Sequence, residues 1–435
     1  MAFQALLLPR WVHPSAMSSL PTVLIFTYAE YGQANVNLAT SYELALAGAD
    51  VYIASFASLT TRVSRLQELI LRHTSHGGDG PIGSVDFLEC KGFASWEEAI
   101  GKHGMTIPGF RHPHGVWGAL EGYSKFDVGM CPWGQEEYVA AIESCKGIVA
   151  TIKPNMVVID ILFYAAMDAC DLLEQKFMTI LPNSIMDIAA GLQPYYAALW
   201  KYPMCVARFV FGFLLFGSCS FSPSISSGFS YPLKWWQIPL NVYLNIRLIV
   251  RALTSAHMNQ FLALRRSLGI TSAIGTIFRP GMTYICSALA ETDFPFAAIP
   301  EEIHLCGPII VPFDPLEESD PVLMKWLDNG PTVMINLGSH VLADEKIAME
   351  IAGAIRILLV HHEKKGTSRM QVLWKAKASG NIENAIRDVV GQEIEEGRVK
   401  VLAWLSAEPV SILQHPNVVC TVHHGGANSY YEGIW

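Results

Sequence analysis

The amino-acid sequence predicts an α/β protein with two Rossmann-like domains, each built on a parallel sheet. Short, continuously apolar runs alternate with helical stretches along most of the 435 residues, as expected where strands are buried on both faces. Residues 311–321 interrupt this pattern with three prolines and four acidic residues, which is typical of a linker. We therefore predict an N-terminal extension at residues 1–20 and domains at residues 21–310 and 322–435.

The first domain begins with a strand–helix–strand pattern. Residues 22–27 (TVLIFT) and 51–55 (VYIAS) are strand-like, and the helical residues 34–47 between them end before Gly48, at a common C-cap position. A helical crossover of this kind predicts parallel strands. The pattern recurs later in the domain, where we expect strands at residues 156–159 (MVVI), 177–181, 282–286 and 303–310, and a helix that follows Asp160 and runs through Leu173.

A long, less regular stretch, residues 74–135, separates these two patterns and is rich in Gly, Pro, His and Trp. Insertions of this kind after strands usually build ligand pockets. We therefore expect this stretch to contribute to a binding site rather than to the core.

The second domain starts with the strand-like residues 332–337 (TVMINL), followed by Gly338-Ser339 and a helix at residues 345–360. We then expect strands at residues 371–374, 399–402 and 418–422 and helices at residues 382–390 and 409–414. The last strand leads into glycines and a helix at residues 430–435 that stops at once. This unfinished pattern predicts that the second domain is incomplete and that the chain is truncated at its C-terminus.

Composition excludes several classes of protein. The net charge of −9 argues against a nucleic-acid partner, because phosphate contacts need clustered Lys and Arg. With 51% hydrophobic and 16% charged residues, the chain is too apolar to be disordered. Nine dispersed cysteines, none in a CxxC motif, favour reduced thiols over disulfides or a zinc site. We therefore expect a cytoplasmic location and no metal.

The strongest membrane candidate is the apolar run 204–221, inside a possible insertion at residues 204–226. Its length reaches the lower limit for a bilayer span, but Arg208 within it costs about 2.5–3.5 kcal/mol at the bilayer centre. We therefore favour a buried segment or a peripheral membrane contact over a span.

Residues 423–432 (HHGGANSYYE) carry the most informative pattern in the chain. A strand that runs through glycines into a helix N-terminus presents backbone N–H groups to an anion. The structural alternative is a capping box, because Ser429 and Glu432 have the required spacing. The residues of the candidate phosphate site are His424, Gly425, Gly426, Asn428 and Ser429.

Together with residues upstream, this segment resembles the signature of the UDP-glycosyltransferase family (family 1). That signature is a tryptophan, a hydrophobic-x-His-Pro motif, a strand and H-x-G-x-N-S-x-x-E. It is similar here to Trp404, Leu413, His415-Pro416 and residues 424–432. The resemblance extends from residue 21 to residue 435, and the segments EYGQANV (30–36) and WKYP (200–203) are closest to fungal members. It implies a GT-B fold, in which two Rossmann-like domains with parallel sheets face each other across a cleft.

The resemblance implies a UDP-sugar donor and no further cofactor. Trp404 would stack on the uracil, and Glu432 would accept hydrogen bonds from the ribose hydroxyls. Alternatives from the residues alone are a core aromatic for Trp404 and a helix N-cap for Ser339. The remaining donor-binding residues that the resemblance implies are Ser339, His424, Gly426, Asn428 and Ser429.

The implied reaction is the inverting transfer of a sugar to a hydroxyl group of a lipophilic small molecule. The family's usual base is a histidine held by an aspartate. Asp160 matches the aspartate, but Gln33 stands at the histidine position, and an amide cannot act as a base. The proton acceptor is then Asp160, Glu30 or a group within residues 74–135. For Asp160, the alternative is a non-catalytic helix N-cap.

Two other functions compete with this one. A truncated or inactive homologue is the leading alternative, because the family's motif for the donor sugar after Glu432 is absent. A nucleotide-binding dehydrogenase is disfavoured, because the first strand–helix turn has a single glycine, Gly32, in place of G-x-G-x-x-G.

Overall fold

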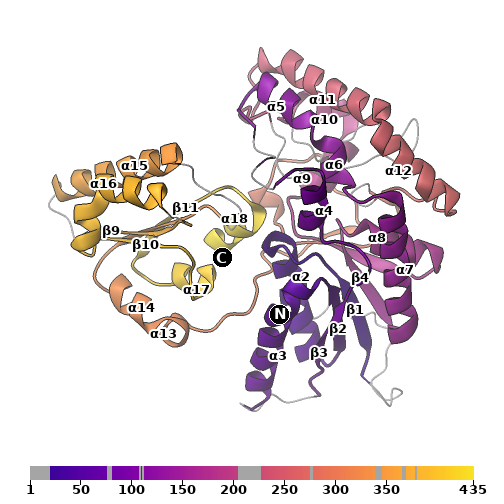
Figure 1. Cartoon of the computed structure of the whole chain (residues 1–435), viewed down its shortest axis with the longest axis horizontal. Coiled ribbons are helices and arrows are strands. Elements are labelled where there is room, and N and C mark those ends of the chain that lie inside the picture. The colour runs from indigo at the N-terminus through magenta and orange to yellow at the C-terminus, as the bar shows by residue number, and fades with distance from the viewer. Residues whose placement is uncertain are drawn as a thin grey trace. The chain divides into compact units, whose positions relative to one another are not determined.

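The computed structural model describes residues 20–75, 81–106, 109, 112–203, 227–274, 278–338, 345–364, 369–377 and 380–435. The chain divides into two compact units, Met1–Val311 and Pro312–Trp435 (Figure 1). Ser339 and the apolar run 204–221 lie outside the described residues. Among the helices that the structure describes, none is both long and apolar enough to cross a bilayer.

The first unit is built on a seven-stranded parallel sheet with the strand order β3-β2-β1-β4-β5-β6-β7. The chain leaves β1 toward β2 on one side and β4 lies on the other, so the carboxyl ends of β1 and β4 form the topological switch point, where open α/β sheets usually bind ligands. The strands are β1 (Thr22–Phe26), β2 (Asp50–Ser55), β3 (Val85–Glu89), β4 (Met156–Asp160), β5 (Phe177–Leu181), β6 (Tyr284–Cys286) and β7 (Ile303–Leu305).

Successive side chains of the interior strand β1 point to opposite faces of this sheet. Val23 and Ile25 of β1 pack with α2 (Tyr31–Leu46) and α3 (Thr60–Ser75), and the intervening Leu24 is also fully buried. Burial on both faces explains the continuous apolar run in the sequence. The longer helices of the unit also include α7 (Gln135–Ile152), α8 (Tyr164–Leu172), α11 (Gln237–Thr254) and α12 (Ala256–Ser267).

Two expectations for this unit were wrong. The supposedly irregular stretch 74–135 contains strand β3 and three short helices, α4 (Trp96–Lys102), α5 (Val116–Tyr123) and α6 (Phe126–Met130), which are too short for their periodicity to show in the sequence. Asp160 is not a helix N-cap, because it is the last residue of β4 and α8 starts only at Tyr164, after Phe163.

The second unit has a four-stranded parallel sheet with the order β10-β9-β8-β11. Val333 and Ile335 of β8 pack beneath α15 and α16, whereas Met334 between them faces α14 and α17. The predicted linker 311–321 contains a short helix, α13 (Leu316–Ser319). The other elements are β8 (Thr332–Asn336), β9 (Gln371–Lys375), β10 (Val399–Leu402), β11 (Val418–His423), α14 (Pro321–Leu327), α15 (Glu345–Lys364), α16 (Asn381–Glu395), α17 (Pro409–Leu413) and α18 (Ala427–Ile434).

Candidate active site

In the first unit, a buried carboxyl group lies at the carboxyl ends of the paired strands β1 and β4. Asp160 ends β4 and its side chain has no exposed surface. The hydroxyl of Thr27, directly after β1, donates to Asp160 Oδ2 at 3.3 Å, and the Leu162 N–H donates to Oδ1 at 3.0 Å. Burial outweighs these two hydrogen bonds and raises the pKa of Asp160 to about 7. Asp160 therefore changes its protonation state near neutral pH.

Gln33, on the first turn of α2, lies between Asp160 and Asn183. With its amide nitrogen turned to Asp160, Gln33 donates to the two carboxylate oxygens at 3.1 and 3.3 Å. With the amide in the opposite orientation, Nε2 donates to Asn183 Oδ1 at 3.3 Å. The Asn37 amide donates to Thr27 Oγ1 at 3.1 Å and to the Gln33 carbonyl at 3.0 Å, which ties α2 to the end of β1. Gln33 is thus a hydrogen-bond partner of Asp160 and supplies no basic group.

Glu30 is a second carboxyl group at the same end of the sheet. It is the N-cap residue of α2 and is half-buried. Partial burial, with a smaller contribution from the Glu97 carboxylate, raises the pKa of Glu30 to about 6. Unlike Asp160, Glu30 is accessible from solvent and is mostly ionised at neutral pH, so it can accept a proton from a bound molecule.

Aromatic side chains surround these carboxyl groups. Tyr28 follows β1, Phe56 follows β2 and Phe163 follows β4, and their rings stack with centroid distances of 4.8 Å for Tyr28–Phe163 and 6.0 Å for Tyr28–Phe56. All three are buried. Sequence reasoning missed this group, although each member comes within three residues of a strand end, a position that parallel strands bring to one edge.

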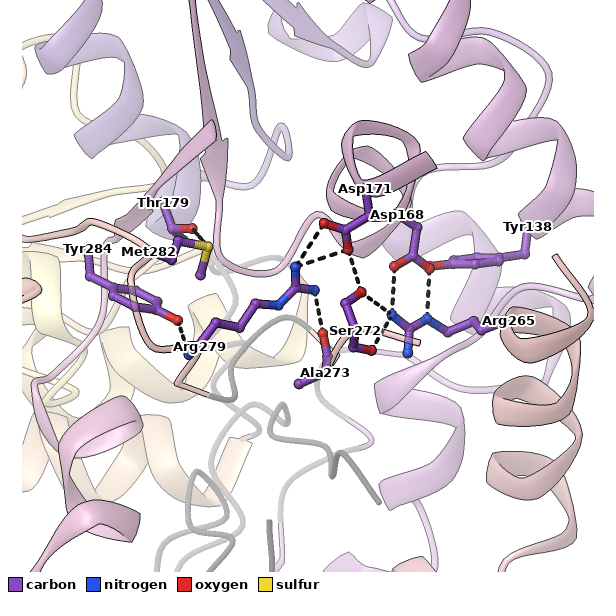
Figure 2. Close-up of polar contacts among 10 residues, drawn as sticks. All are labelled: Tyr138, Asp168, Asp171, Thr179, Arg265, Ser272, Ala273, Arg279, Met282 and Tyr284. Atoms are coloured by element: carbon purple, nitrogen blue, oxygen red, sulfur yellow. Dashed lines mark hydrogen bonds and ion pairs between the residues drawn. The ribbon is translucent and has the colours of Figure 1, made fainter. Parts of the chain in front are cut away.

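Helix α8, which follows Asp160, is held by one buried and one partly buried ion pair (Figure 2). Arg265 of α12 donates to both oxygens of Asp168 at 2.8 and 2.7 Å, and the Tyr138 hydroxyl donates to Asp168 at 2.8 Å. Arg279 donates twice to Asp171, at 3.0 and 3.2 Å. Arg265 and Asp168 are at most 4% exposed, so this network fastens α8 to the elements that follow it in the chain.

In the second unit, the glycine-rich segment lies between β11 and α18. Helix α18 begins at Ala427 with Gly426 as its N-cap, in extended conformation and without a side-chain cap. Ser429 is therefore inside the first turn, and the capping-box alternative is wrong. Asn428 and Ser429 lie in this first turn, where the backbone N–H groups point toward the N-terminal end of the helix.

The imidazole of His424 packs against two glycine backbones. A Cβ atom placed on Gly338, whose φ is +87°, lies 2.9 Å from His424 Cε1, and one placed on Gly426 collides with His424 Nε2. Gly338 follows β8 and His424 follows β11, so the close approach joins the carboxyl ends of two paired strands. Any side chain at either glycine displaces the histidine.

Trp404, shortly after β10, is 53% exposed and is not a core aromatic. The ammonium of Lys375, the last residue of β9, lies 4.1 Å from the centroid of the indole. Burial and the neighbouring carboxylate of Glu408 raise the pKa of Glu432 to about 7, and Lys375 opposes this shift. Burial lowers the pKa of Lys375, while Glu432 and Glu408 act to raise it. The four side chains form one electrostatically coupled group.

Comparison with known proteins identifies the family. No family model matches the sequence. The glycosyltransferase sdnJ of Sordaria araneosa is 34% identical over 429 residues, which is 95% of this chain and 78% of that protein. This chain belongs to the UDP-glycosyltransferase family.

Solved structures agree with the fold expected of such a protein. The crystal structure of the glycosyltransferase of kitacinnamycin matches with a TM-score of 0.54 and 12% identity, and covers 96% of this chain and 78% of its own. UGT71G1 of Medicago truncatula, complexed with UDP-glucose, matches with a TM-score of 0.52 and 13% identity over the same shares. The two parallel-sheet domains of this UDP-glycosyltransferase therefore have the GT-B fold.

Sequence reasoning on this UDP-glycosyltransferase missed Lys375 and Glu408. Lys375 is the last residue of a strand, and Glu408 directly precedes α17. The position of Lys375 at the end of a strand could have indicated a binding residue, because ligands bind at the carboxyl ends of parallel strands in such sheets. Nothing in the local sequence relates either residue to Glu432, since the link depends on how α18 packs.

Proposed function

We propose that this UDP-glycosyltransferase transfers a sugar from a UDP-sugar to a hydroxyl group of a lipophilic small molecule, with inversion at the anomeric carbon. The observation that carries the proposal is the half-exposed indole of Trp404, which is coupled to Lys375 and Glu432. Trp404 and the glycine-rich turn both follow the carboxyl ends of strands in the second sheet. This edge offers a stacking surface, an anion site and a hydrogen-bond acceptor, which are the three recognition elements that a nucleoside diphosphate requires.

Each part of the donor has a matching group. The uracil stacks on Trp404 and takes the place of the Lys375 ammonium over the ring. The diphosphate binds at the N-terminus of α18, where N–H groups and the helix dipole favour negative charge, with Gly426, Asn428, Ser429 and His424 around it. We assign Ser339 to this site on the family resemblance alone, because it lies outside the described residues. The Glu432 carboxylate accepts hydrogen bonds from the ribose hydroxyls.

For the acceptor, we propose Glu30 as the proton acceptor and Asp160 as the group that positions Gln33. Asp160 has no exposed surface, so a substrate cannot reach it without displacement of Gln33, whereas Glu30 is half-buried. As Glu30 removes the proton, the hydroxyl oxygen attacks the anomeric carbon, and UDP departs with its negative charge stabilised at α18. Tyr28, Phe56 and Phe163 are buried, so they make the surroundings of the carboxyl groups apolar but do not themselves contact the acceptor. The reaction requires no metal or further cofactor.

Calorimetric titration with UDP tests the donor site. We expect UDP to bind and Trp404→Ala to weaken the affinity by about tenfold or more, because stacking on an aromatic ring contributes about 1–3 kcal/mol per base. Trp117→Ala removes an exposed tryptophan of the first unit and serves as the matched control. GDP is titrated in parallel. Equal UDP affinity in the Trp404 and Trp117 variants, or tighter binding of GDP than of UDP, contradicts the proposal.

The pH dependence of the transfer rate tests the proton acceptor, with UDP-glucose and a panel of lipophilic alcohols and phenols. Because the base must be ionised, kcat/KM falls as pH drops below about 6, the pKa of Glu30. We expect Glu30→Gln to lower kcat by about 10²–10⁴-fold and to abolish this acid limb. Glu97→Gln, the control, keeps the rate and moves the limb to lower pH. An acid limb near pH 7 that persists in Glu30→Gln instead assigns the role to Asp160.

A further inference from the structure

Helix α11 presents apolar side chains on its outer face. Its inner face holds Asn241, whose amide donates to the carbonyls of Leu199 and Tyr202 at 2.8 and 2.9 Å, and Asn245, whose amide donates to the Asn241 carbonyl at 2.8 Å. The outer face repeats every three or four residues and consists of Leu240, Tyr243, Ile246, Val250 and Leu253, each 42–50% exposed.

The inner face also buries Leu244 and Leu248, so α11 is apolar on both faces, whereas an ordinary surface helix turns polar residues toward water. These exposed apolar residues extend from Leu240 to Leu253 on α11, which lies at the outer edge of the first unit beside α5 and α10 (Ala197–Trp200) (Figure 1). Contiguous exposed apolar surface of this kind marks an interaction site.

Two tryptophans extend the outer face at the N-terminal end of α11. Trp235 is 78% exposed and Trp236 is 51% exposed, and their rings form an edge-to-face pair with centroids 5.6 Å apart. Lys234 lies beside them, with its ammonium 5.2 Å from the centroid of the Trp236 ring. Tryptophan and lysine together are typical of the boundary between lipid headgroups and acyl chains, where the ring is partly buried and the ammonium remains hydrated.

The part of the sequence that contains this face is rich in cations, in an otherwise acidic protein. Residues 188–290 contain eight Lys and Arg and no Asp or Glu, whereas the rest of the chain holds 22 Lys and Arg and all 39 acidic residues. Three of these cations, Arg251, Arg265 and Arg279, are paired with the carboxylates of Asp127, Asp168 and Asp171. Arg247 and Lys234 are exposed, and Arg247 lies within the outer face. Arg247 and Lys234 therefore give this face a positive charge that complements a negatively charged surface.

We propose that the outer face of α11, together with Lys234, Trp235 and Trp236, docks on bilayers that contain anionic lipids. The helix lies in the interfacial plane with its apolar side chains among the acyl chains, while Arg247 and Lys234 contact the headgroups. A second copy of the chain is disfavoured as the occupant, because a two-fold contact of this face with itself brings Arg247 against Arg247.

Co-sedimentation of the full chain with vesicles tests the proposal. We expect binding to vesicles of phosphatidylcholine with phosphatidylserine, and weaker binding to phosphatidylcholine alone or at raised salt. Ile246→Asp with Val250→Asp lowers the partition coefficient by about tenfold or more, because about 1.5–3 kcal/mol is lost for each buried aliphatic side chain. Arg247→Glu removes the preference for phosphatidylserine.

The control is Ile357→Asp with Val360→Asp, the same change on exposed positions of α15 in the second unit, which leaves vesicle binding unchanged. Circular dichroism establishes that each variant is folded, and Trp235→Phe with Trp236→Phe loses the lipid-dependent blue shift of fluorescence. The proposal is overturned if the chain sediments neither with vesicles that contain phosphatidylserine nor with vesicles of phosphatidylcholine alone. So does a double variant of α11 that binds like the unmodified chain, or a dimer that this double variant converts to a monomer without loss of lipid binding.

Discussion

Asp160 is held in an environment that disfavours its ionised form. Its pKa of about 7 lies above the value of about 4 in an unfolded chain, so between these pH values the folded state binds more protons. The stability of the first unit therefore falls as pH rises from about 4 through 7. Because ionised Asp160 destabilises the first unit, its carboxyl group is better explained by its hydrogen bonds to Gln33 than by a contribution to stability.

We predict that Asp160→Asn flattens this dependence. At pH values above about 7, the variant is more stable than the unmodified chain by roughly 2–4 kcal/mol, because an amide carries no charge to desolvate. Urea unfolding across the pH range measures the difference. Glu68→Gln, at an exposed position on α3, keeps the original pH dependence. A variant that loses stability at high pH contradicts the prediction.

The coupled group in the second unit predicts a pH-dependent affinity for UDP. Glu432 loses acceptor capacity when it is protonated, so the Kd for UDP rises as pH falls through about 7. Lys375→Met moves the midpoint of this rise to higher pH, because Lys375 opposes the shift, and Glu408→Gln moves it to lower pH. Calorimetric titration over this window measures both midpoints, and a flat profile in the unmodified chain contradicts the assignment.

At the scale of elements, α8 depends on a buried ion pair. Asp168→Ala leaves the guanidinium of Arg265 without its carboxylate in a site that is 4% exposed. We predict a loss of about 3–5 kcal/mol in the free energy of unfolding, and partial recovery in Asp168→Ala with Arg265→Met. Chemical denaturation measures both.

The exposed pair of Arg387 and Glu383 on α16 is the matched control. Arg387→Ala is expected to change stability by less than about 1 kcal/mol, because solvent screens that pair. If Asp168→Ala is as mild as this control, α8 is held by its apolar contacts alone.

At the scale of the whole molecule, the two units have separate cores. A ligand that binds one unit stabilises that unit alone by mass action. We predict that UDP at about 100 times its Kd adds about 2.7 kcal/mol to the second unit and raises one of two calorimetric transitions by several degrees. Trp404→Ala abolishes the shift. Equal shifts of both transitions, or none, contradict the placement of the donor site in the second unit.

Much of this architecture could be predicted from local sequence. TVLIF at Thr22–Phe26 and TVMIN at Thr332–Asn336 are strands because apolar side chains at every position need cover on both faces of a sheet. The glycines before α18 also indicated a turn into a helix. Gly425 has a φ of +80°, which other residues adopt only with strain. The short helices α4 to α6 could not, because they span too few turns to show a period.

The sequence alone determined the two parallel sheets, the linker at residues 311–321 and the family signature from Trp404 to Glu432. Strand burial and glycine turns depend on residues that are adjacent in the chain. Only the tertiary structure decided that Asp160 is inaccessible, that Lys375 lies over Trp404 and that α11 turns its apolar face outward. These properties depend on which distant segments meet. Desolvation, ion pairing and exposure are set by neighbours in space, and a sequence records only neighbours along the chain.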